Sequence, residues 1–273
     1  RRCLLCSDDR QPKTILEKGH LDEHLRILVA AGIDPIVAVQ MATLNAAECF
    51  RLFDRGAIAP GLRADIVLLD DLKHFKADAV FIEGRLVARG GRYLLPVTRH
   101  SIEQVRGSFH VKDFSVEDVK LKLKSDDVNN IDILPGGVVT AKGKAKVKRD
   151  GQGCFLYDAS QDVVKVAVVE RHQSTGNVAV ALLRGYGITE GAVAISIAHD
   201  SHNIIVVGVD DEDMALAVQS LIAQSGGMVL VKNREVIASM PMPVGGIMSD
   251  QSGEWVDRKL SEIHETAYKE LHI

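Results

Sequence analysis

The stretch RGAIAPGLRADIVL, residues 55–68, separates two hydrophobic patterns in the first hundred residues. Upstream of it, apolar residues recur at helical spacing, which predicts helices. From Gly56 onward the period changes to two, which predicts strands. Gly56 and Gly61 suit tight turns, because glycine adopts backbone conformations that other residues avoid. The stretch therefore predicts a chain that passes from a helical segment into a small sheet.

Two helices are predicted upstream of this stretch. The first begins near Leu21 and ends at Gly32, a residue suited to a helix C-terminus. Asp34 and Pro35 predict the start of the second, with an N-cap acid followed by proline in the first helical position. We expect this second helix to end near Leu52. Its expected buried stripe comprises Val37, Met41, Leu44 and Ala47.

An apolar run at residues 3–6, CLLC, stands directly before the acidic motif SDDR at residues 7–10. Such a run predicts a strand buried on both faces, as in a parallel sheet or barrel. Acids at the C-terminal end of a barrel strand stand where α/β barrels place their chemistry. The residues alone leave two interpretations of Asp8 and Asp9 open, namely functional carboxylates or caps of the next helix.

The rest of the chain predicts an antiparallel block, a polar connector and a separate mixed α/β or α+β domain. Expected strands of the block are residues 66–69, 79–82, 86–88 and 93–95. Expected elements of the last domain are strands 163–169, 178–183, 192–198 and 204–207, a helix capped by Asp210, a hairpin 228–231/236–238 and a final helix bearing residues 256–271. The predicted parts are residues 1–53, 54–97, 98–112 and 113–273.

Composition argues against nucleic acid and membrane as partners. The 273 residues include 33 Lys+Arg and 37 Asp+Glu, a net charge of −4, and the only basic block is the Lys-rich patch at residues 142–149. Aromatic residues make up 4%, few for base-stacking platforms. No apolar stretch approaches the roughly 20 residues that span a bilayer, and no secretory signal is seen. We expect a cytoplasmic protein.

Four cysteines give no zinc-binding or disulfide pattern. Cys3 and Cys6 form one C-x-x-C, but no second pair accompanies it. We interpret the cysteines as buried thiols of a cytosolic protein. The chain also lacks an initiator Met and opens directly on the expected strand, which could not stand without neighbours. We therefore expect the C-terminal part of a longer protein, although an incomplete gene sequence would look the same.

Residues 41–47, MATLNAA, together with residues 55–68 resemble the closing part of the amidohydrolase superfamily, with its G-x-I-x-x-G-x-x-A-D-hydrophobic pattern. The resemblance implies the end of a metal-dependent (β/α)8 barrel followed by a small β-sandwich. It places Asp8 at the end of the eighth barrel strand, beside the metal. It implies that Asp8 takes a proton from metal-bound water and delivers it to the leaving group. For Asp9, substrate contact, support of the site and helix capping stay open.

A more specific resemblance is to the bacterial adenine deaminase family, and it covers nearly the whole chain. It implies hydrolysis of adenine to hypoxanthine and ammonia, in purine salvage, with manganese or iron as the divalent metal. We also expect a homo-oligomer. The motifs that carry the resemblance are CSDDR (6–10), GHLD (19–22), VVERH (168–172), AHDSHNI (198–204) and MPMPVGGIMSD (240–250).

Residues 199–203, HDSHN, form the densest polar cluster in an apolar neighbourhood. One interpretation places His199, Asp200 and His202 at the substrate, where they hold the purine or close the site. Another is a turn that satisfies its own backbone. An independent metal site at the two histidines would lack a third ligand. For His20 we favour a helix-start contact, and for His172 a packing role.

Metal ligands other than Asp8 are expected upstream of residue 1, so the chain alone is not expected to catalyse hydrolysis. The H-x-E with P-C-x-x-C of zinc nucleobase deaminases is absent from the sequence. Two alternatives to adenine deamination stay open. One is another amidohydrolase, acting on a cyclic amide or amino-heterocycle. The other is a non-catalytic fragment or a module that completes a barrel supplied by another polypeptide.

Overall fold

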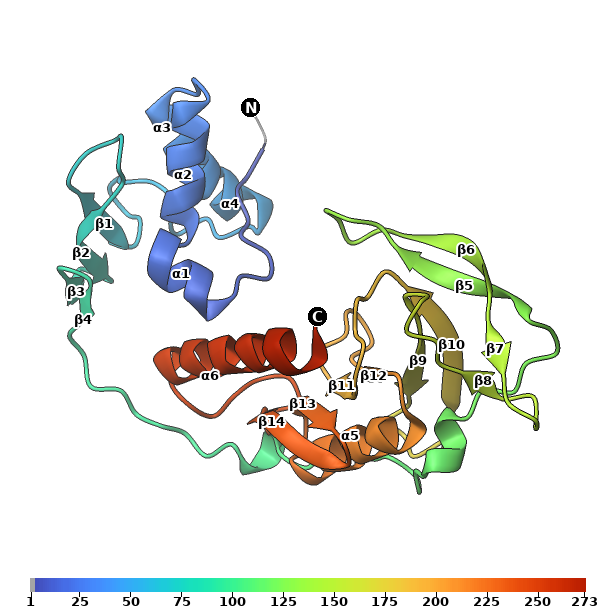
Figure 1. Cartoon of the computed structure of the whole chain (residues 1–273). Helices are drawn as coiled ribbons and strands as arrows, with labels where there is room; N and C mark the ends of the chain where they lie inside the picture. Colours follow the sequence, from blue (N-terminus) through green and yellow to red (C-terminus); the bar gives the residue numbers. More distant parts are fainter. Residues whose placement is uncertain (1–2) are drawn as a thin grey trace. The chain divides into compact units, whose positions relative to one another are not determined.

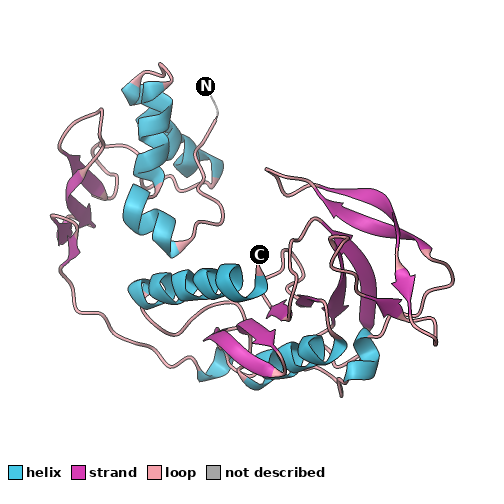
Figure 2. Ribbon diagram, in the orientation of Figure 1, coloured by secondary structure: helices cyan, strands magenta, loops and turns pink. Residues whose placement is uncertain are grey.

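The computed structural model describes residues 3–273, which divide into two compact units, residues 3–100 and 101–273. The first unit combines four helices with a small sheet, and the second is built around a large sheet (Figures 1 and 2). The mixed α/β architecture predicted from the sequence is confirmed at this level. None of the helices within residues 3–273 has the length and apolar character needed to cross a membrane.

The first unit places its helices before its sheet, as the change of period at residue 56 predicts. Its helices are α1 (Pro12–Lys18), α2 (Leu21–Ala30), α3 (Pro35–Ala42) and α4 (Leu44–Cys49). Its sheet contains β1 (Ile66–Leu69), β2 (Ala77–Ile82), β3 (Arg85–Arg89) and β4 (Arg92–Tyr93), each antiparallel to the next. A core of Leu25, Ala38 and Phe75 joins the helices to β1.

A helix cap, a glycine turn and a side-chain hydrogen bond connect the elements of this unit. Asp34 caps α3 as predicted, because its Oδ1 accepts hydrogen bonds from the N–H groups of Ile36 and Val37. Gly56 has φ +98°, and a Cβ there would come within 2.6 Å of the Ala47 side chain. Only glycine therefore lets the 55–68 stretch approach α4 this closely. Asp65 Oδ1 accepts the Glu83 N–H at 2.9 Å and so ties β1 to the β2–β3 turn.

Three predictions for the first unit are wrong. Residues 3–6 are not a strand, since no strand among the described residues pairs with them; their backbone instead hydrogen bonds to Met41 O, at 3.1 Å from Leu5 N. The second helix is broken at Thr43, whose hydroxyl donates to Val39 O at 2.7 Å. Its expected stripe is also incomplete, because Val37 is 47% exposed while Ala38 is buried.

The cysteines are not buried as predicted. Cys3, Cys6 and Cys49 are exposed and Cys154 is half-buried, all as free thiols. The prediction relied on Cys3 and Cys6 lying in a strand covered on both faces. Since residues 3–6 have no strand neighbours in the described part of the chain, Cys3 and Cys6 are exposed, whereas Leu4 and Leu5 are half-buried.

The second unit is built on an eight-stranded sheet with the order β14-β13-β11-β12-β9-β10-β5-β6. All neighbouring pairs are antiparallel except β5 and β10, which are parallel. The strands are β5 (Asp127–Ile133), β6 (Thr140–Lys146), β9 (Val163–Val169), β10 (Val178–Arg184), β11 (Ala192–Ile195), β12 (Ile204–Gly208), β13 (Gly227–Lys232) and β14 (Glu235–Pro241). The other elements are η1 (Glu103–Val105), η2 (Val116–Val119), β7 (Lys148–Arg149), β8 (Phe155–Leu156), α5 (Asp211–Ala223), α6 (Gly253–Thr266) and η3 (Ala267–Leu271).

Helices cover both faces of this sheet. Helix α5 packs its Met214, Val218 and Leu221 side chains on one face. Helix α6 and η3 pack on the other face, through Leu260, Ile263 and Leu271. Successive strand residues alternate between the two clusters, which explains why the central strands read as continuous apolar runs. The predicted cap is confirmed, because Asp210 Oδ1 accepts the N–H groups at the start of α5.

Candidate functional site

The acidic motif of the first unit is an exposed turn between residues 3–6 and α1. Asp8 has φ +50°, a backbone conformation found more often for aspartate than for most residues. Its Oδ1 accepts the N–H of Asp9 at 2.8 Å, and both acids are exposed. The N-cap position of α1 belongs to Gln11, which makes no side-chain cap bond. The capping interpretation of Asp8 is therefore not what the structure shows at this helix.

His20 contacts the acidic turn at both of its ends. Its Nε2 lies 2.8 Å from Ser7 Oγ, and its carbonyl accepts a hydrogen bond from Arg10 Nη1 at 3.0 Å. Arg10 also forms an ion pair with Glu23 of α2. His20 thus occupies the N-cap position of α2, as its expected helix-start contact requires, and also contacts both ends of the 7–10 motif. The turn that carries Asp8 is anchored through its neighbours and leaves the Asp8 carboxylate open.

Asp22 completes this support. Its Oδ1 accepts the His20 N–H at 2.6 Å, and its Oδ2 pairs with Arg26 at 2.8 Å. Partial burial raises the pKa of Asp22, but hydrogen bonds from Arg26 and the His20 N–H outweigh burial and hold that pKa below its usual value. The carboxylate that fixes His20 therefore stays ionised at neutral pH.

In the second unit, the three quoted motifs converge at one end of the large sheet. Residues 168–172 end β9, residues 198–204 connect β11 to β12, and residues 240–250 follow β14. The strand register brings these ends together, because β12 lies between β9 and β11 and is antiparallel to both. Segments separated by up to about 80 residues thus form one cluster, which the sequence alone could not assemble.

Arg171 is the centre of this cluster. Its side chain is 2% exposed, and its Nε donates to His202 O at 2.5 Å. Its Nη1 and Nη2 donate to Ser108 O at 3.4 Å and Gly245 O at 3.2 Å. The guanidinium carbon lies 4.5 Å from the centre of the Phe109 ring, a cation–π contact. Burial lowers the pKa of Arg171 from its ordinary value, yet an arginine stays charged at neutral pH.

The residues on either side of Arg171 fix neighbouring loops. The Glu170 carboxylate accepts the N–H groups of Thr175, His172 and Gln173. These bonds, led by the one from Thr175, lower the pKa of Glu170 to about 2. His172 Nε2 lies 2.8 Å from Ser201 O. Glu170, Arg171 and His172, which we call the ERH clamp, therefore hold both their own loop and the 199–203 turn.

The 199–203 turn satisfies much of its own backbone and still presents polar side chains. His202 N–H donates to Ala198 O at 2.7 Å, and His202 Nδ1 accepts the Ala198 N–H at 3.2 Å. The rings of His199 and His202 meet edge to face at 4.9 Å. His199 and Asp200 are exposed and His202 is half-buried. The turn thus combines features of both interpretations left open by the sequence.

No metal centre is assembled within residues 3–273. This part of the chain contains no group of three or more His, Cys, Asp or Glu side chains that could hold a metal ion. His202 already uses Nδ1 as a hydrogen-bond acceptor, which leaves less of the histidine pair free for a cation. Asp8 and Asp9 belong to the first unit, and the 199–203 turn belongs to the second.

Arg171 is the residue that the sequence analysis missed. It lies within VVERH, a motif in which the sequence alone points to no role for this residue. One signal is present, since a charged residue just beyond the end of an apolar strand must find partners if the strand end is buried. Its actual partners lie 31 to 74 residues away in the chain, so their identity could not be inferred.

Comparison with known proteins finds two families that match this chain. Residues 137–273 match the family described as the adenine deaminase C-terminal domain, and residues 2–87 match the amidohydrolase family. Adenine deaminase 2 of Desulfotalea psychrophila is 62% identical over all 273 residues, and adenine deaminase of Ligilactobacillus salivarius is 48% identical over the same span. Adenine deaminase 2 of Carboxydothermus hydrogenoformans is 40% identical over 96% of this chain.

The chain spans about half the length of these curated relatives, since the matched region is 46% to 47% of each. One family match thus falls on each unit, and all the quoted motifs lie inside the matched ranges. Residues 88–136 lie outside both matches. With residues 137–273 accounting for half of the sequence, this chain belongs to the adenine deaminase family.

Proposed function

We propose that this chain forms part of an enzyme that hydrolyses adenine to hypoxanthine and ammonia. The observation that carries the proposal is the exposed Asp8 carboxylate within the amidohydrolase match, on the same chain as the adenine deaminase domain. The names of the relatives give adenine as their substrate. Those relatives are about twice as long as this chain, so the activity is proposed for the protein that contains it.

Asp8 is proposed to move the proton during the reaction. Water oxygen bonds to C6 of the purine, and Asp8 takes a proton from that water. The proton passes to the ring and then to the amino nitrogen, the C6–N bond breaks, and ammonia leaves. Adenine and one water thus give hypoxanthine and one ammonia. An exposed carboxylate on an anchored turn suits this role, because its position is fixed while its oxygens stay accessible.

The substrate-side residues are proposed to be Asp9, His199, Asp200 and His202. Adenine offers ring nitrogens that accept hydrogen bonds and an amino group that donates them. Carboxylates and imidazoles complement these groups. The ERH clamp supports this part of the proposal, because it fixes the backbone of the turn through His202 O and Ser201 O. His199 and Asp200 are the exposed side chains of that turn.

The amidohydrolase match implies a divalent metal, and we propose manganese or iron, with Asp8 as one ligand. The described residues do not fit a complete metal site, because Asp8 is a single exposed carboxylate and residues 3–273 offer no three-ligand cluster. The proposal therefore needs ligands other than residues 3–273. Lowering the pKa of the attacking water would be the metal's contribution, and the role proposed for this chain is the transfer of that water's proton by Asp8.

The remaining proposals concern the setting of the enzyme. We propose that residues 1–53 close a (β/α)8 barrel, that residues 54–97 contribute to a β-sandwich, and that residues 113–273 form the third domain after a connector at 98–112. We further propose a cytoplasmic homo-oligomer that acts in purine salvage, with adenine and no nucleic acid or membrane as its partner. The family membership and the architecture of the two units support this setting.

The test measures ammonia release from adenine by the protein isolated from its own cells, loaded with manganese or iron. Asp8→Asn should lower kcat by at least about a hundredfold, the range of general acid–base contributions. Asp78→Asn is the matched control, since Asp78 is an exposed aspartate of β2. It should leave kcat unchanged. Full activity in Asp8→Asn would contradict the proton-transfer role.

A substrate panel tests the reaction class separately. Adenine should release ammonia, whereas hydantoin and dihydroorotate, which are cyclic amides, should not be hydrolysed. Hydrolysis of a cyclic amide without action on adenine would replace the proposal with the other amidohydrolase activity. Absence of any hydrolysis in the metal-loaded native protein would favour a non-catalytic role.

A further inference from the structure

His20 contacts the chain on both sides of Asp8. Its imidazole Nε2 lies 2.8 Å from Ser7 Oγ, and its carbonyl oxygen accepts a hydrogen bond from Arg10 Nη1 at 3.0 Å. Ser7 directly precedes Asp8, and Arg10 follows it by two residues. One residue from outside the acidic turn therefore holds both flanks of the carboxylate that the proposed reaction uses, although neither of these two contacts is to Asp8 itself.

The turn passes this restraint on to the Asp8 side chain. Asp8 has φ +50°, and its Oδ1 accepts the N–H of Asp9 at 2.8 Å. The carboxylate is thus tied to the backbone of its own turn, so a shift of that backbone moves the carboxylate with it. Chemical steps are sensitive to such shifts, because a misplacement of about 1 Å can lower a rate about a hundredfold.

His20 is itself fixed by the next turn of the chain. Asp22 Oδ1 accepts the His20 N–H at 2.6 Å, and Asp22 Oδ2 pairs with Arg26 Nη1 at 2.8 Å. Arg26 also donates to the carbonyl oxygen of Lys18 and, at 3.0 Å, to that of His74. The Asp22–Arg26 pair therefore ties His20 to the end of α1 and to the loop between β1 and β2.

The sequence GHLD, residues 19–22, suits this arrangement. Gly19 has φ +96°, and a Cβ at this position would clash with the Asp22 carboxylate. Glycine therefore lets that carboxylate close on the backbone of residue 20. His20 occupies the N-cap position of α2 but makes no side-chain cap bond, whereas serine, threonine, aspartate or asparagine would cap the helix. The imidazole thus serves the acidic turn and not the helix that it precedes.

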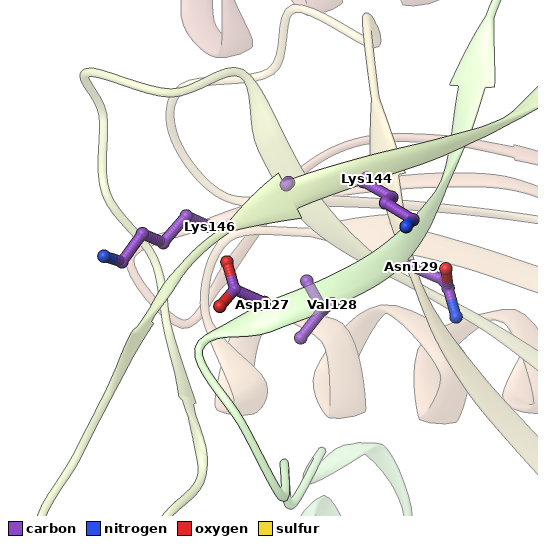
Figure 3. A pocket seen from close by; sticks show the side chains of 6 residues that line it. Asp127, Val128, Asn129, Lys144 and Lys146 are labelled. Carbon is purple, nitrogen blue, oxygen red and sulfur yellow. The ribbon is translucent and has the colours of Figure 1, made fainter.

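The charged surface of the hairpin β5–β6 provides a contrast. Asp127 and Asn129 extend from β5, and Lys144 and Lys146 extend from β6, beside one hollow (Figure 3). Among the described residues, no hydrogen bond or ion pair joins any two of these four side chains. Such an arrangement is typical of a solvated surface. The contacts of His20, in contrast, converge on a single turn.

We propose that His20 is a positioning residue for the proton transfer, acting through Asp8 by holding Ser7 and Arg10 in place. This inference rests on the proposed function, in which Asp8 transfers the proton. It gives His20 no contact with adenine and no share in moving the proton. The Asp22–Arg26 pair supports His20 in turn, one step further from the carboxylate.

The first measurement follows the turn itself, by hydrogen exchange of residues 7–11 in the isolated protein that contains this chain. His20→Ala and Ser7→Ala should each speed this exchange, because each removes the bond between the imidazole and Ser7 Oγ. His20→Gln should keep it slow, since a glutamine amide can reach the same hydroxyl. His100→Ala is the matched control, at an exposed histidine of the first unit, and should change nothing.

The second measurement is a double-variant cycle with Asp8, read as kcat for ammonia release from adenine. His20→Ala should lower kcat by at least about tenfold, and His20→Gln should recover most of that loss. In the Asp8→Asn background, His20→Ala should cause no further loss, because the carboxylate through which it acts is already gone. A full additional loss in that background would overturn the proposal, since His20 would then act by another route.

Together the two measurements separate this inference from the function on which it rests. Unchanged exchange and unchanged kcat in His20→Ala would leave adenine deamination standing and overturn the positioning role. A protein that releases no ammonia from adenine, yet loses protection of residues 7–11 in His20→Ala, would overturn the proposed function and with it the catalytic role of His20, while the anchoring of the turn would stand. Because His20 is exposed, His20→Ala should leave the unfolding midpoint unchanged, and this check excludes general unfolding as the cause.

Discussion

The two units differ in how completely they bury their own apolar side chains. Among residues 3–100, 17 large apolar side chains are exposed, against 11 among residues 101–273. In the second unit, helices cover both faces of the sheet and the core residues are almost fully buried. In the first unit, the joint core is small, and side chains such as Phe53 and Ile58 are 75% and 84% exposed.

The edge strands of the two sheets show the same difference. Strand β1, IVLL, is an edge strand without a charge, and its Val67 and Leu68 are both about half exposed. Strand β6 is also an edge strand, but alternate lysines protect it. An apolar, uncharged edge favours pairing with another strand, whereas a lysine-bearing edge resists it. The first unit is therefore patterned to pack against further protein surface, and the second is patterned to stand by itself.

Separate expression of the two units is the most direct test of this difference in burial. Residues 101–273 should unfold cooperatively in urea, with the midpoint that they have in the whole chain, because their core is closed. Trp255 is the only tryptophan of the chain and packs against the buried core that includes Leu260 and Ile263, so its fluorescence reports this unit alone. Residues 1–100 should bind a hydrophobic dye strongly and show no sharp transition.

Equally cooperative unfolding of the two isolated units would show that the exposed apolar side chains of the first unit do not prevent it from folding by itself. Circular dichroism provides the measurement for residues 1–100, which contain no tryptophan. The intact chain serves as the reference in the same buffer, and it should show two transitions if the units unfold independently.

Substitution of Arg171 should have the next largest effect, on the stability of the second unit. Arg171→Ala should lower the free energy of unfolding of the second unit by about 3 kcal/mol, because it leaves partly buried carbonyl groups without their donor and removes the contact with Phe109. Arg171→Lys keeps the charge but not the planar fork and should recover part of that loss. Urea titration followed by Trp255 fluorescence measures both variants.

Arg258→Ala is the control for this series, since Arg258 is an exposed arginine of α6. It should change the free energy of unfolding by no more than about 0.5 kcal/mol. If Arg171→Ala were as mild as this control, the motif ends would be held by packing alone. The ERH clamp would then have no part in positioning the 199–203 turn.

Sequence analysis succeeded where the determinants are local. The caps at Asp34 and Asp210 were predicted because the capping side chain and the amides that it binds are two or three residues apart. It failed where partners lie far away in the chain. Residues 3–6 have the composition of a buried strand but no strand partner among the described residues, and a strand depends on its partner. The Asp8 and 199–203 assignments stay predictions, because their test is chemical.

The missed hairpin β5–β6 shows a second limit. Strand β6 reads TAKGKAK, so its inward face carries only alanines and a glycine, and no apolar run marks it as a strand. Lys165 shows a third limit, since it lies in the apolar strand β9 and is 2% exposed. It is accommodated by Asp211 and by the carbonyl of Val119 at 3.0 Å, groups that the fold brings to it.

Substitution of Glu170 should have the smallest effect on the second unit. Its pH dependence distinguishes the ERH clamp from the packed core. Hydrogen bonds from the N–H of Thr175 and its neighbours lower the pKa of Glu170 to about 2, below its ordinary 4.5. The folded state therefore binds this proton more weakly than the unfolded state does. Its contribution to stability is fully present above pH 4.5 and is lost as the pH falls from about 4.5 to about 2. Protection of the His172, Gln173 and Thr175 amides from hydrogen exchange, relative to unstructured amides at the same pH, should fall in that range. In Glu170→Gln these amides should be weakly protected at all pH values, without the pH dependence, while the amides of β9 stay protected. Loss of protection in β9 over the same range would mean that the loop and the sheet open together, and that the second unit has no separately held clamp.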